Sequence, residues 1–309
     1  MLHVLVLGSA AGGGFPQWNC NCALCRRARA GDPKVKRRTQ CSLAVSSGDG
    51  KWFLLNASPD LRTQIDDNPD LHPKAGARHS PIAGAVLTGA DIDFIAGLLN
   101  LRESQPLAVY ATGRVQSVLN ANSVYRVLNP EYVDRRELAL GKPIDIAGKD
   151  GKPNGISVEG FSVPGKVALY LEDPSAKGYG SYAEDAIGLK VTDRATGKHF
   201  FYVPGCAEMP PELAARLKGA ALVFFDGTVW NDDEMIASRT GTKTGARMGH
   251  MHLAGRDGSV AAFAGLGVKR KVFVHINNTN PVLAEDSPER AQVEAAGWEV
   301  GFDGMRVAL

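Results

Sequence analysis

Three cysteines stand within six residues near the start of the chain, in the segment Asn-Cys-Asn-Cys-Ala-Leu-Cys. Thiolates at C-x-C-x-x-C spacing can converge on one tetrahedral ion, and zinc is the metal that such sites most often hold. The alternative is that Cys20, Cys22 and Cys25 are small buried side chains without a ligand. Because no open catalytic position is evident around them, we interpret the motif as a structural zinc site with its fourth ligand elsewhere.

A second group with metal-binding chemistry is a pair of carboxylates, Asp91 and Asp93, which follows a predicted buried strand over residues 82–88. Loops that join a strand to a helix often present side chains into a cleft. Two carboxylates there could bind a hard or borderline cation. The alternative for Asp93 alone is the N-cap of the helix that follows.

Imidazoles occur at two further places. His275 closes an apolar strand and precedes a run with three asparagines, and His250 follows a glycine and is predicted to begin a helix. A lone strand histidine is more often a satisfied core residue, but the polar run favours a cleft position for His275. Asp226 ends another apolar strand, with a turn aspartate as its alternative. The acidic run 232–234 is expected to be a solvated helix start.

The thiol of Cys206 follows a predicted strand at 199–203. A catalytic cysteine requires an adjacent base, and the sequence places none beside it. We therefore give Cys206 no catalytic role.

Composition limits the classes of function. The chain has 309 residues, with 35 Lys and Arg against 33 Asp and Glu, so no basic field favours nucleic acid. No apolar run is long enough to cross a membrane. The five cysteines are an odd number and do not form a secreted disulfide framework. The apolar start, 3–7, is expected to be a buried strand rather than a signal peptide, so we expect a cytoplasmic protein.

Hydrophobic patterns predict the elements that carry these residues. The expected strands are 3–7, 40–46, 52–56, 82–88, 108–111, 156–163, 167–172, 186–192, 199–203, 222–226, 272–276, 298–301 and 305–308. One helix is expected to start near residue 58. Four others are expected over residues 94–101, 113–128, 211–217 and 258–264. In each half of the chain, a run of strands is followed by alternating strands and helices. This pattern favours two packed sheets with helices outside. No linker is evident, so residues 1–309 are expected to form one domain.

Five segments together resemble the coenzyme PQQ synthesis protein B family of the metallo-β-lactamase superfamily. They are residues 7–22, 56–60, 225–230, 275–281 and 302–305, and the resemblance spans nearly the whole chain. It implies an αββα sandwich of two similar halves, with two mixed β-sheets, outer helices and a metal site at one edge.

The superfamily's metal motif, H-x-H-x-D-H, aligns with this chain on Thr88. Its four ligand positions then fall on Gly89, Asp91, Asp93 and Phe94. Of the four motif residues, only the aspartate, at position 93, is kept. The family that the chain resembles has an aspartate at the second ligand position, as at Asp91, and keeps the last histidine. Phe94 departs from that pattern, and phenylalanine cannot ligate a metal.

Other roles carry over from the resemblance one position at a time. His275 matches the final histidine ligand, and His250 matches a histidine near the substrate that binds metal or acts as general acid/base. Cys206 stands where a bridging aspartate is usual, which argues against a dinuclear zinc hydrolase. Asn278 stands where related phosphodiesterases that share the three-cysteine motif place their fourth zinc ligand.

The resemblance implies a mononuclear Fe²⁺ site, with Asp91, Asp93 and His275 as ligands. His250 would be a fourth ligand or a proton carrier, and Asp226 would orient a ligand. The implied activity is iron- and O₂-dependent hydroxylation of the tyrosine ring of a Glu-Tyr-derived precursor of pyrroloquinoline quinone (PQQ). Other proteins of the PQQ pathway are the implied partners.

Two other functions are compatible with the sequence. One is a non-catalytic carrier that aids transport of PQQ or its precursor to the periplasm. The weaker one is a zinc-dependent phosphodiester or lactam hydrolase. No nucleic acid or membrane partner is expected, and the oligomeric state is open between a monomer and a homodimer.

Overall fold

Both faces of the first strand, β1 (His3–Gly8), are buried, because apolar residues occupy consecutive positions along it. Side chains alternate between the two faces of a strand. Val4 and Val6 therefore face a core between two sheets, whereas Leu5 and Leu7 face a second core beneath helices. A strand buried on both faces requires a layer on each side, and the chain supplies both.

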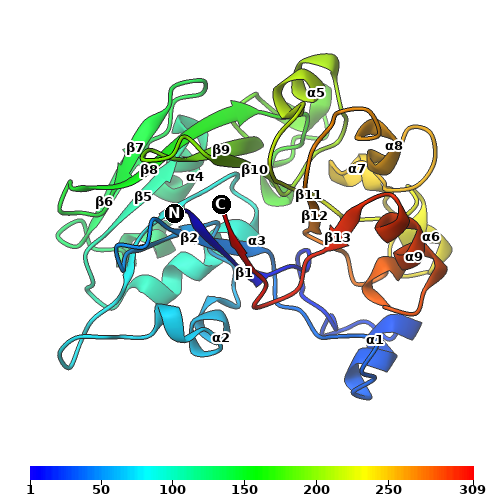
Figure 1. Cartoon of the computed structure of the whole chain (residues 1–309), viewed down its shortest axis with the longest axis horizontal. Coiled ribbons are helices and arrows are strands. Elements are labelled where there is room, and N and C mark those ends of the chain that lie inside the picture. The colour runs from blue at the N-terminus through cyan, green and yellow to red at the C-terminus, as the bar shows by residue number, and fades with distance from the viewer.

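Two seven-stranded sheets pack against each other in a computed structural model that describes residues 1–309 (Figure 1). The first sheet contains, in spatial order, β14 (Arg306–Ala308), β1, β2 (Ser42–Ser46), β3 (Trp52–Leu55), β4 (Ile82–Val86), β5 (Leu107–Ala111) and β6 (Val133–Glu137). The second contains β13 (Trp298–Val300), β12 (Lys271–Val274), β11 (Val223–Asp226), β10 (His199–Val203), β9 (Ile187–Asp193), β8 (Pro153–Ser162) and β7 (Ile144–Ala147). Each sheet has antiparallel and parallel pairs, so both are mixed.

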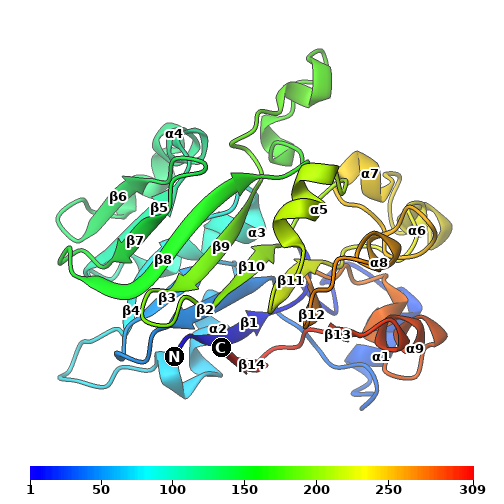
Figure 2. The ribbon, with the colours of Figure 1, turned by 45° about the horizontal axis from the view of Figure 1, so that its top comes forward.

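Helices cover the outer face of each sheet (Figure 2). The α-helices are α1 (Ala23–Arg29), α2 (Leu61–Asp66), α3 (Ile92–Ile95), α4 (Gly113–Ala121), α5 (Pro211–Leu217), α6 (Glu234–Ala237), α7 (Gly245–Met248), α8 (Ser259–Ala262) and α9 (Pro288–Ala295). Short 3₁₀ turns are η1 (Pro69–Leu71), η2 (Ala96–Leu101), η3 (Ser123–Val127), η4 (Leu169–Leu171), η5 (Lys177–Gly180) and η6 (Pro281–Leu283). Helices α2 to α4 pack on the first sheet, and α1, α5 and α9 on the second. The expected αββα sandwich is confirmed.

Several predicted elements differ from the structure. The strand expected at 167–172 is wrong: the segment forms η4 in a loop that pairs with no strand. The helix expected at 113–128 ends at Ala121, because Asn122 adopts an extended backbone, and a 3₁₀ turn follows. The edge strand β6 was missed because its sequence, Val-Asp-Arg-Arg-Glu, is mostly polar.

No helix in the structure combines the length and the apolar character needed to cross a lipid bilayer.

Parallel strands bring the expected site residues to one edge of the sandwich. Strands β10, β11 and β12 pair in parallel, so their carboxyl ends lie side by side. Asp226 is the last residue of β11, and His275 follows β12 directly. Across the sandwich, the loop after β4 carries Asp91 and Asp93 to the same edge. The topology alone therefore assembles residues that are far apart in sequence.

Asp303 connects three segments next to this edge. One carboxylate oxygen accepts hydrogen bonds from the backbone and hydroxyl of Ser9, both at 3.1 Å. The other accepts from the backbone and hydroxyl of Thr39, at 2.6 and 2.7 Å. The carbonyl of Ser9 in turn accepts from the backbone of Ile276, the residue after His275. Asp303 therefore holds the loop that supports His275.

We expect Asp303→Ala to lower the free energy of unfolding by about 2–3 kcal/mol, because four donors lose their acceptor. Asp303→Asn keeps one acceptor oxygen and should lose less. Urea unfolding of both variants measures the difference. An alanine variant as stable as the native protein would show that these four bonds do not contribute.

Candidate metal centre

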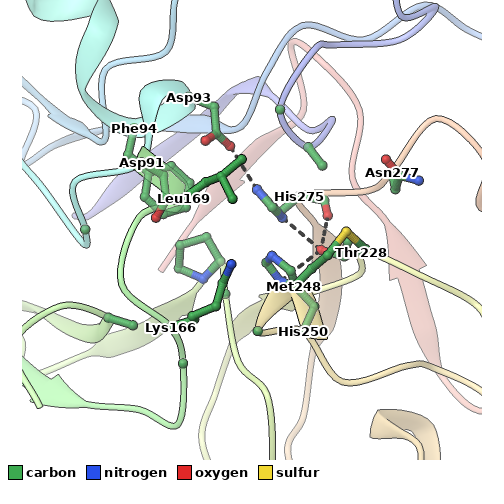
Figure 3. Close-up of a pocket in the computed structure, with 18 of the residues that line it drawn as sticks. Asp91, Asp93, Phe94, Lys166, Leu169, Thr228, Met248, His250, His275 and Asn277 are labelled. Atoms are coloured by element: carbon green, nitrogen blue, oxygen red, sulfur yellow. Dashed lines mark hydrogen bonds and ion pairs between the residues drawn. The ribbon is translucent and has the colours of Figure 1, made fainter. Parts of the chain in front are cut away.

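A cavity of about 420 Å³ opens at the edge where the strand ends meet. Four of the predicted site residues line it: Asp91, Asp93, His250 and His275 (Figure 3). Asp226 lies beneath the cavity and is fully buried. The structure therefore brings together all five residues that the sequence indicated for an active site.

His275 and Asp93 make the closest contact between ligand-type atoms from the two sheets. Nε2 of His275 lies 3.0 Å from Oδ2 of Asp93. Nδ1 of His275 lies 2.9 Å from the hydroxyl of Thr228, which itself donates to Asp226 at 2.6 Å. When the single hydroxyl proton of Thr228 is directed to Asp226, Nδ1 of His275 is the donor to the hydroxyl oxygen, and Nε2 faces Asp93.

Nε2 of His275 and Oδ2 of Asp93 therefore face each other at hydrogen-bond distance. Such a pair is stable only with a proton or a metal cation between the two atoms. Burial by itself lowers the pKa of His275, but the carboxylates of Asp93, Asp226 and Asp91 outweigh it and raise that pKa above its usual value. The geometry and the electrostatics both favour positive charge at this point.

The backbone at His275 is also unusual, with a φ of 55°. A left-handed conformation is uncommon for residues other than glycine, and it is often found at functional sites. This conformation turns the ring back toward the first sheet and Asp93. It cannot be inferred from the sequence, because the residue is a histidine and not a glycine.

Asp226 orients the ring of His250 directly, whereas Thr228 orients the ring of His275. Nδ1 of His250 lies 2.6 Å from Oδ2 of Asp226, which also accepts from the backbone of Cys206 at 2.9 Å. The ring stacks on that of His275 with centroids 5.0 Å apart. With Nδ1 donating to Asp226, the lone pair of His250 is on Nε2. His250 follows α7 and does not begin a helix as expected, because Gly249 ends α7 with a φ of 90°.

Asp91 stands at the N-cap position of α3, yet its carboxylate makes no capping hydrogen bond. Asp93 lies in the first turn of α3, so its alternative role as an N-cap is wrong. Burial, followed by the charge of Asp93, raises the pKa of Asp91 to about 6. The two carboxylates repel each other, and a bound cation would reduce this repulsion.

Phe94 and Gly89 occupy two positions at which the superfamily motif has histidines, and they fit each other. A Cβ atom on Gly89 would lie 3.4 Å from the ring of Phe94. That ring packs edge-on against His275, with centroids 5.6 Å apart. A side chain at position 89 would be tightest against the backbone oxygen of Asp185, at 3.1 Å, and the ring of Phe94 makes this side of the cavity an apolar wall.

The three cysteines of the N-terminal motif converge at a second place, with their sulfur atoms within 4.8 Å of one another. Backbone N–H groups of Cys22 and Cys25 point at sulfur atoms, which suits thiolates. The side-chain amide of Asn278 lies beside all three sulfurs, 3.1 Å from Cys20 and 3.4 Å from Cys25. The donor set fits one tetrahedral zinc ion. Rotation of the amide would present its oxygen as a fourth ligand.

Other residues at the site were not singled out from the sequence. Thr228 was missed, although an Asp-Gly-Thr run after an apolar strand marks it. Asn56 was also missed; its side chain bonds both the backbone and the hydroxyl of Thr88 and fixes the start of the loop to Asp91. Lys166 lines the cavity and pairs with Glu172. No spacing in the sequence indicated these contacts.

Cys206 is fully buried, and its thiol donates to the carbonyl of Glu208. Burial raises the pKa of this thiol to about 12, so it is not a nucleophile at neutral pH. The site uses only its backbone N–H, which helps to hold Asp226.

The sequence matches the beta-lactamase superfamily domain over residues 51–276. It is 53% identical to coenzyme PQQ synthesis protein B of Gluconacetobacter diazotrophicus, over 99% of both chains. It is 51% identical to coenzyme PQQ synthesis protein B of Rhodopseudomonas palustris, over 100% of both chains.

Among solved structures, Zn²⁺-bound PqqB from Methylobacterium extorquens aligns with a TM-score of 0.94 at 50% identity, covering 99% of this chain and all of that one. A diphosphatase of the PhnP family aligns with a TM-score of 0.69 at 20% identity, covering 99% of this chain and 96% of that one, and shows the fold alone.

The fold and the matched domain define a member of the metallo-β-lactamase superfamily. Within that superfamily, the chain belongs to the coenzyme PQQ synthesis protein B family. Membership assigns it a role in PQQ biosynthesis. A metal cofactor is supported by the zinc-bound relative and by the ligand clusters of this chain.

We expect Cys25→Ser to lose about one zinc per chain, because a structural zinc needs its full set of thiolates. Cys206→Ser is the matched control, since its thiol lies outside the cluster. Elemental analysis after gel filtration measures both. Equal zinc in the two variants would contradict the assignment of the cluster.

Glu234 is buried, so the expectation that the acidic run 232–234 is wholly solvated is wrong. Its carboxylate accepts from the backbone of Trp230 at 2.6 Å and from the hydroxyl of Thr279 at 2.5 Å. Burial raises the pKa of Glu234 to about 7. At a pH between the lower pKa of Glu234 in the unfolded state and its pKa of about 7 in the folded state, the folded protein therefore keeps a proton that the unfolded protein releases.

The stability that comes from this proton is fully present below the unfolded pKa and is lost as pH rises through the folded pKa, near 7. Glutamine mimics the protonated acid, so Glu234→Gln should gain stability relative to the native protein by about 1–3 kcal/mol between pH 5 and pH 8. Urea unfolding across this range measures the gain. A constant difference would contradict the raised pKa.

Proposed function

We propose that this protein hydroxylates the tyrosine ring of a Glu-Tyr-derived PQQ precursor, with bound Fe²⁺, O₂ and two electrons from an external reductant, so that one oxygen atom enters the ring and the other leaves as water. The observation that supports the proposal most directly is the 3.0 Å contact between Nε2 of His275 and Oδ2 of Asp93 beside an open cavity, where a proton or a metal cation can lie between the two atoms. Asp91 and Nε2 of His250 are the further ligand groups on the same cavity.

A set of carboxylates and imidazoles with open positions is the type of site that non-haem Fe²⁺ oxygenases use. Asp91, Asp93 and His275 would hold the iron, with His250 as a fourth ligand or a proton carrier. The iron, when bound, supplies the activation of O₂ that an aromatic hydroxylation requires. Dinuclear zinc hydrolysis fits poorly, because Gly89 and Phe94 offer no ligand to a second metal and the buried thiol of Cys206 is directed to the carbonyl of Glu208.

The protein's own residues have separate tasks in this proposal. Asp226 fixes the tautomer of His250, so that Nε2 can accept or return a proton at the substrate. Thr228 fixes the ring orientation and the tautomer of His275, so that Nε2 of His275 is free for the metal. Phe94 and Leu169 place apolar surface around the cavity, which limits water at the reacting ring.

A cytoplasmic location is part of the proposal, because reducing conditions keep the thiols of the cysteine cluster available for zinc. Other enzymes of the PQQ pathway would supply the peptide-derived precursor and take up the product.

A carrier of PQQ or its precursor is the second candidate. Phe94 supports it, since an apolar ring replaces a metal ligand in a cavity large enough for a small molecule. A carrier would need only the zinc of the cysteine cluster, so iron dependence separates the two functions.

We expect His275→Ala and Asp91→Ala to lower iron-dependent hydroxylation by more than about 100-fold, because each removes a ligand of the metal. The assay follows ¹⁸O from ¹⁸O₂ into the tyrosine ring of a Glu-Tyr dipeptide, with anaerobically reconstituted protein and ascorbate as the reductant. Asp67→Asn, an exposed aspartate, is the control. Unchanged activity in either ligand variant would overturn the proposal.

A further inference from the structure

One wall of the metal cavity carries positive charge. Lys166 and Lys243 both line it, and Figure 3 shows the ammonium of Lys166 pointing into the cavity on the side of His250. A cation in the same cavity as a divalent metal is repelled by that metal. Its presence therefore needs an explanation in the chemistry of what the cavity binds.

The charge on this wall is only partly neutralised. Lys166 pairs with Glu172, but the same carboxylate also accepts from Arg247, at 2.8 and 3.2 Å. Arg247 in turn stacks on Tyr179, with 3.8 Å from its guanidinium carbon to the ring centroid. These two cations share one carboxylate, which holds them in place, and the positive charge of Lys166 also acts on the carboxylate of Asp91 in the same cavity.

Lys243 is different, because no carboxylate lies within ion-pair distance of it. Its side chain is half-buried. An ammonium without a carboxylate partner, at the wall of a cavity, is suited to binding an anionic group of a ligand.

The rest of the lining defines the other part of the ligand. Phe94, Leu169, Met235 and Met248 contribute apolar surface to the cavity, and a cavity of this volume takes a small organic molecule. Apolar surface suits an aromatic ring beside the metal ligands, while the lysines suit carboxylates at its periphery.

The geometry points to a carboxylate-recognition site formed by Lys243 and Lys166, which selects aromatic acids and orients their ring toward Asp93 and His275. Glu172 acts as a positioning residue that holds Lys166. The inference rests on the proposed function for the identity of the ring, but binding can be measured without turnover.

The test is calorimetric titration of zinc-loaded protein with the dipeptide Glu-Tyr and with Gln-Tyr amide, which lacks both carboxylates. We expect native protein to bind Glu-Tyr at least about tenfold more tightly than the amide, as charge-assisted hydrogen bonds require. Lys243→Gln should weaken Glu-Tyr binding about tenfold, and Lys243→Arg, which keeps the charge, should restore most of it.

Lys218→Gln is the matched control, because it removes one exposed lysine far from the cavity lining. Salt gives a second readout: raising NaCl from about 50 to about 500 mM should weaken binding to native protein more than to Lys243→Gln. Equal affinity of native and Lys243→Gln for Glu-Tyr, equal affinity for the two dipeptides, or no binding of Glu-Tyr at millimolar concentration would each overturn the inference.

The outcomes separate this inference from the proposed function. Selective binding of Glu-Tyr without hydroxylation by the iron-loaded protein would support the carboxylate site and contradict the hydroxylase. Hydroxylation with the same KM in native protein and Lys243→Gln would support the hydroxylase and overturn the carboxylate site.

Discussion

The fully buried carboxylate of Asp226 is the group on which the arrangement of the cavity depends. It accepts from the backbone of Cys206, the hydroxyl of Thr228 and Nδ1 of His250. Through Thr228 it also sets the proton on His275. A buried charge is stable only when it is fully hydrogen-bonded, and these bonds have a second effect. They direct Nδ1 of His250 toward Asp226 and Nδ1 of His275 toward Thr228, so that Nε2 of both imidazoles faces away from Asp226.

The fold keeps this arrangement in place from several directions. Parallel strands bring Asp226 and His275 together at their carboxyl ends, and Asp303 ties the loop beside Ile276 to two other segments. Asn278, three residues after His275, contacts the cysteine cluster. A zinc ion at that cluster would therefore stabilise the same loop that carries His275. In the proposed function, zinc at the cysteine cluster would therefore help to position the cavity that His275 lines.

Much of this architecture could be predicted from the sequence, and the failures have physical causes. The apolar strands and the five site residues from Asp91 to His275 were identified from local patterns, because strand ends and polar runs are visible in a single sequence. The hydroxyl of Thr228, the turn of His275 and the pairing of Lys166 with Glu172 depend on residues distant in the chain. Edge strand β6 and the loop around η4 were assigned incorrectly, because polarity and apolarity there reflect exposure and not strand pairing.

The most direct test of a metal site at Asp93 and His275 is the iron content of protein purified and reconstituted without oxygen. About one iron per chain is expected in addition to one zinc, with the iron lost and the zinc retained in Asp93→Ala. One zinc and no iron in the native protein after reconstitution, or iron that persists in Asp93→Ala, would contradict the assignment of this cavity as an iron centre.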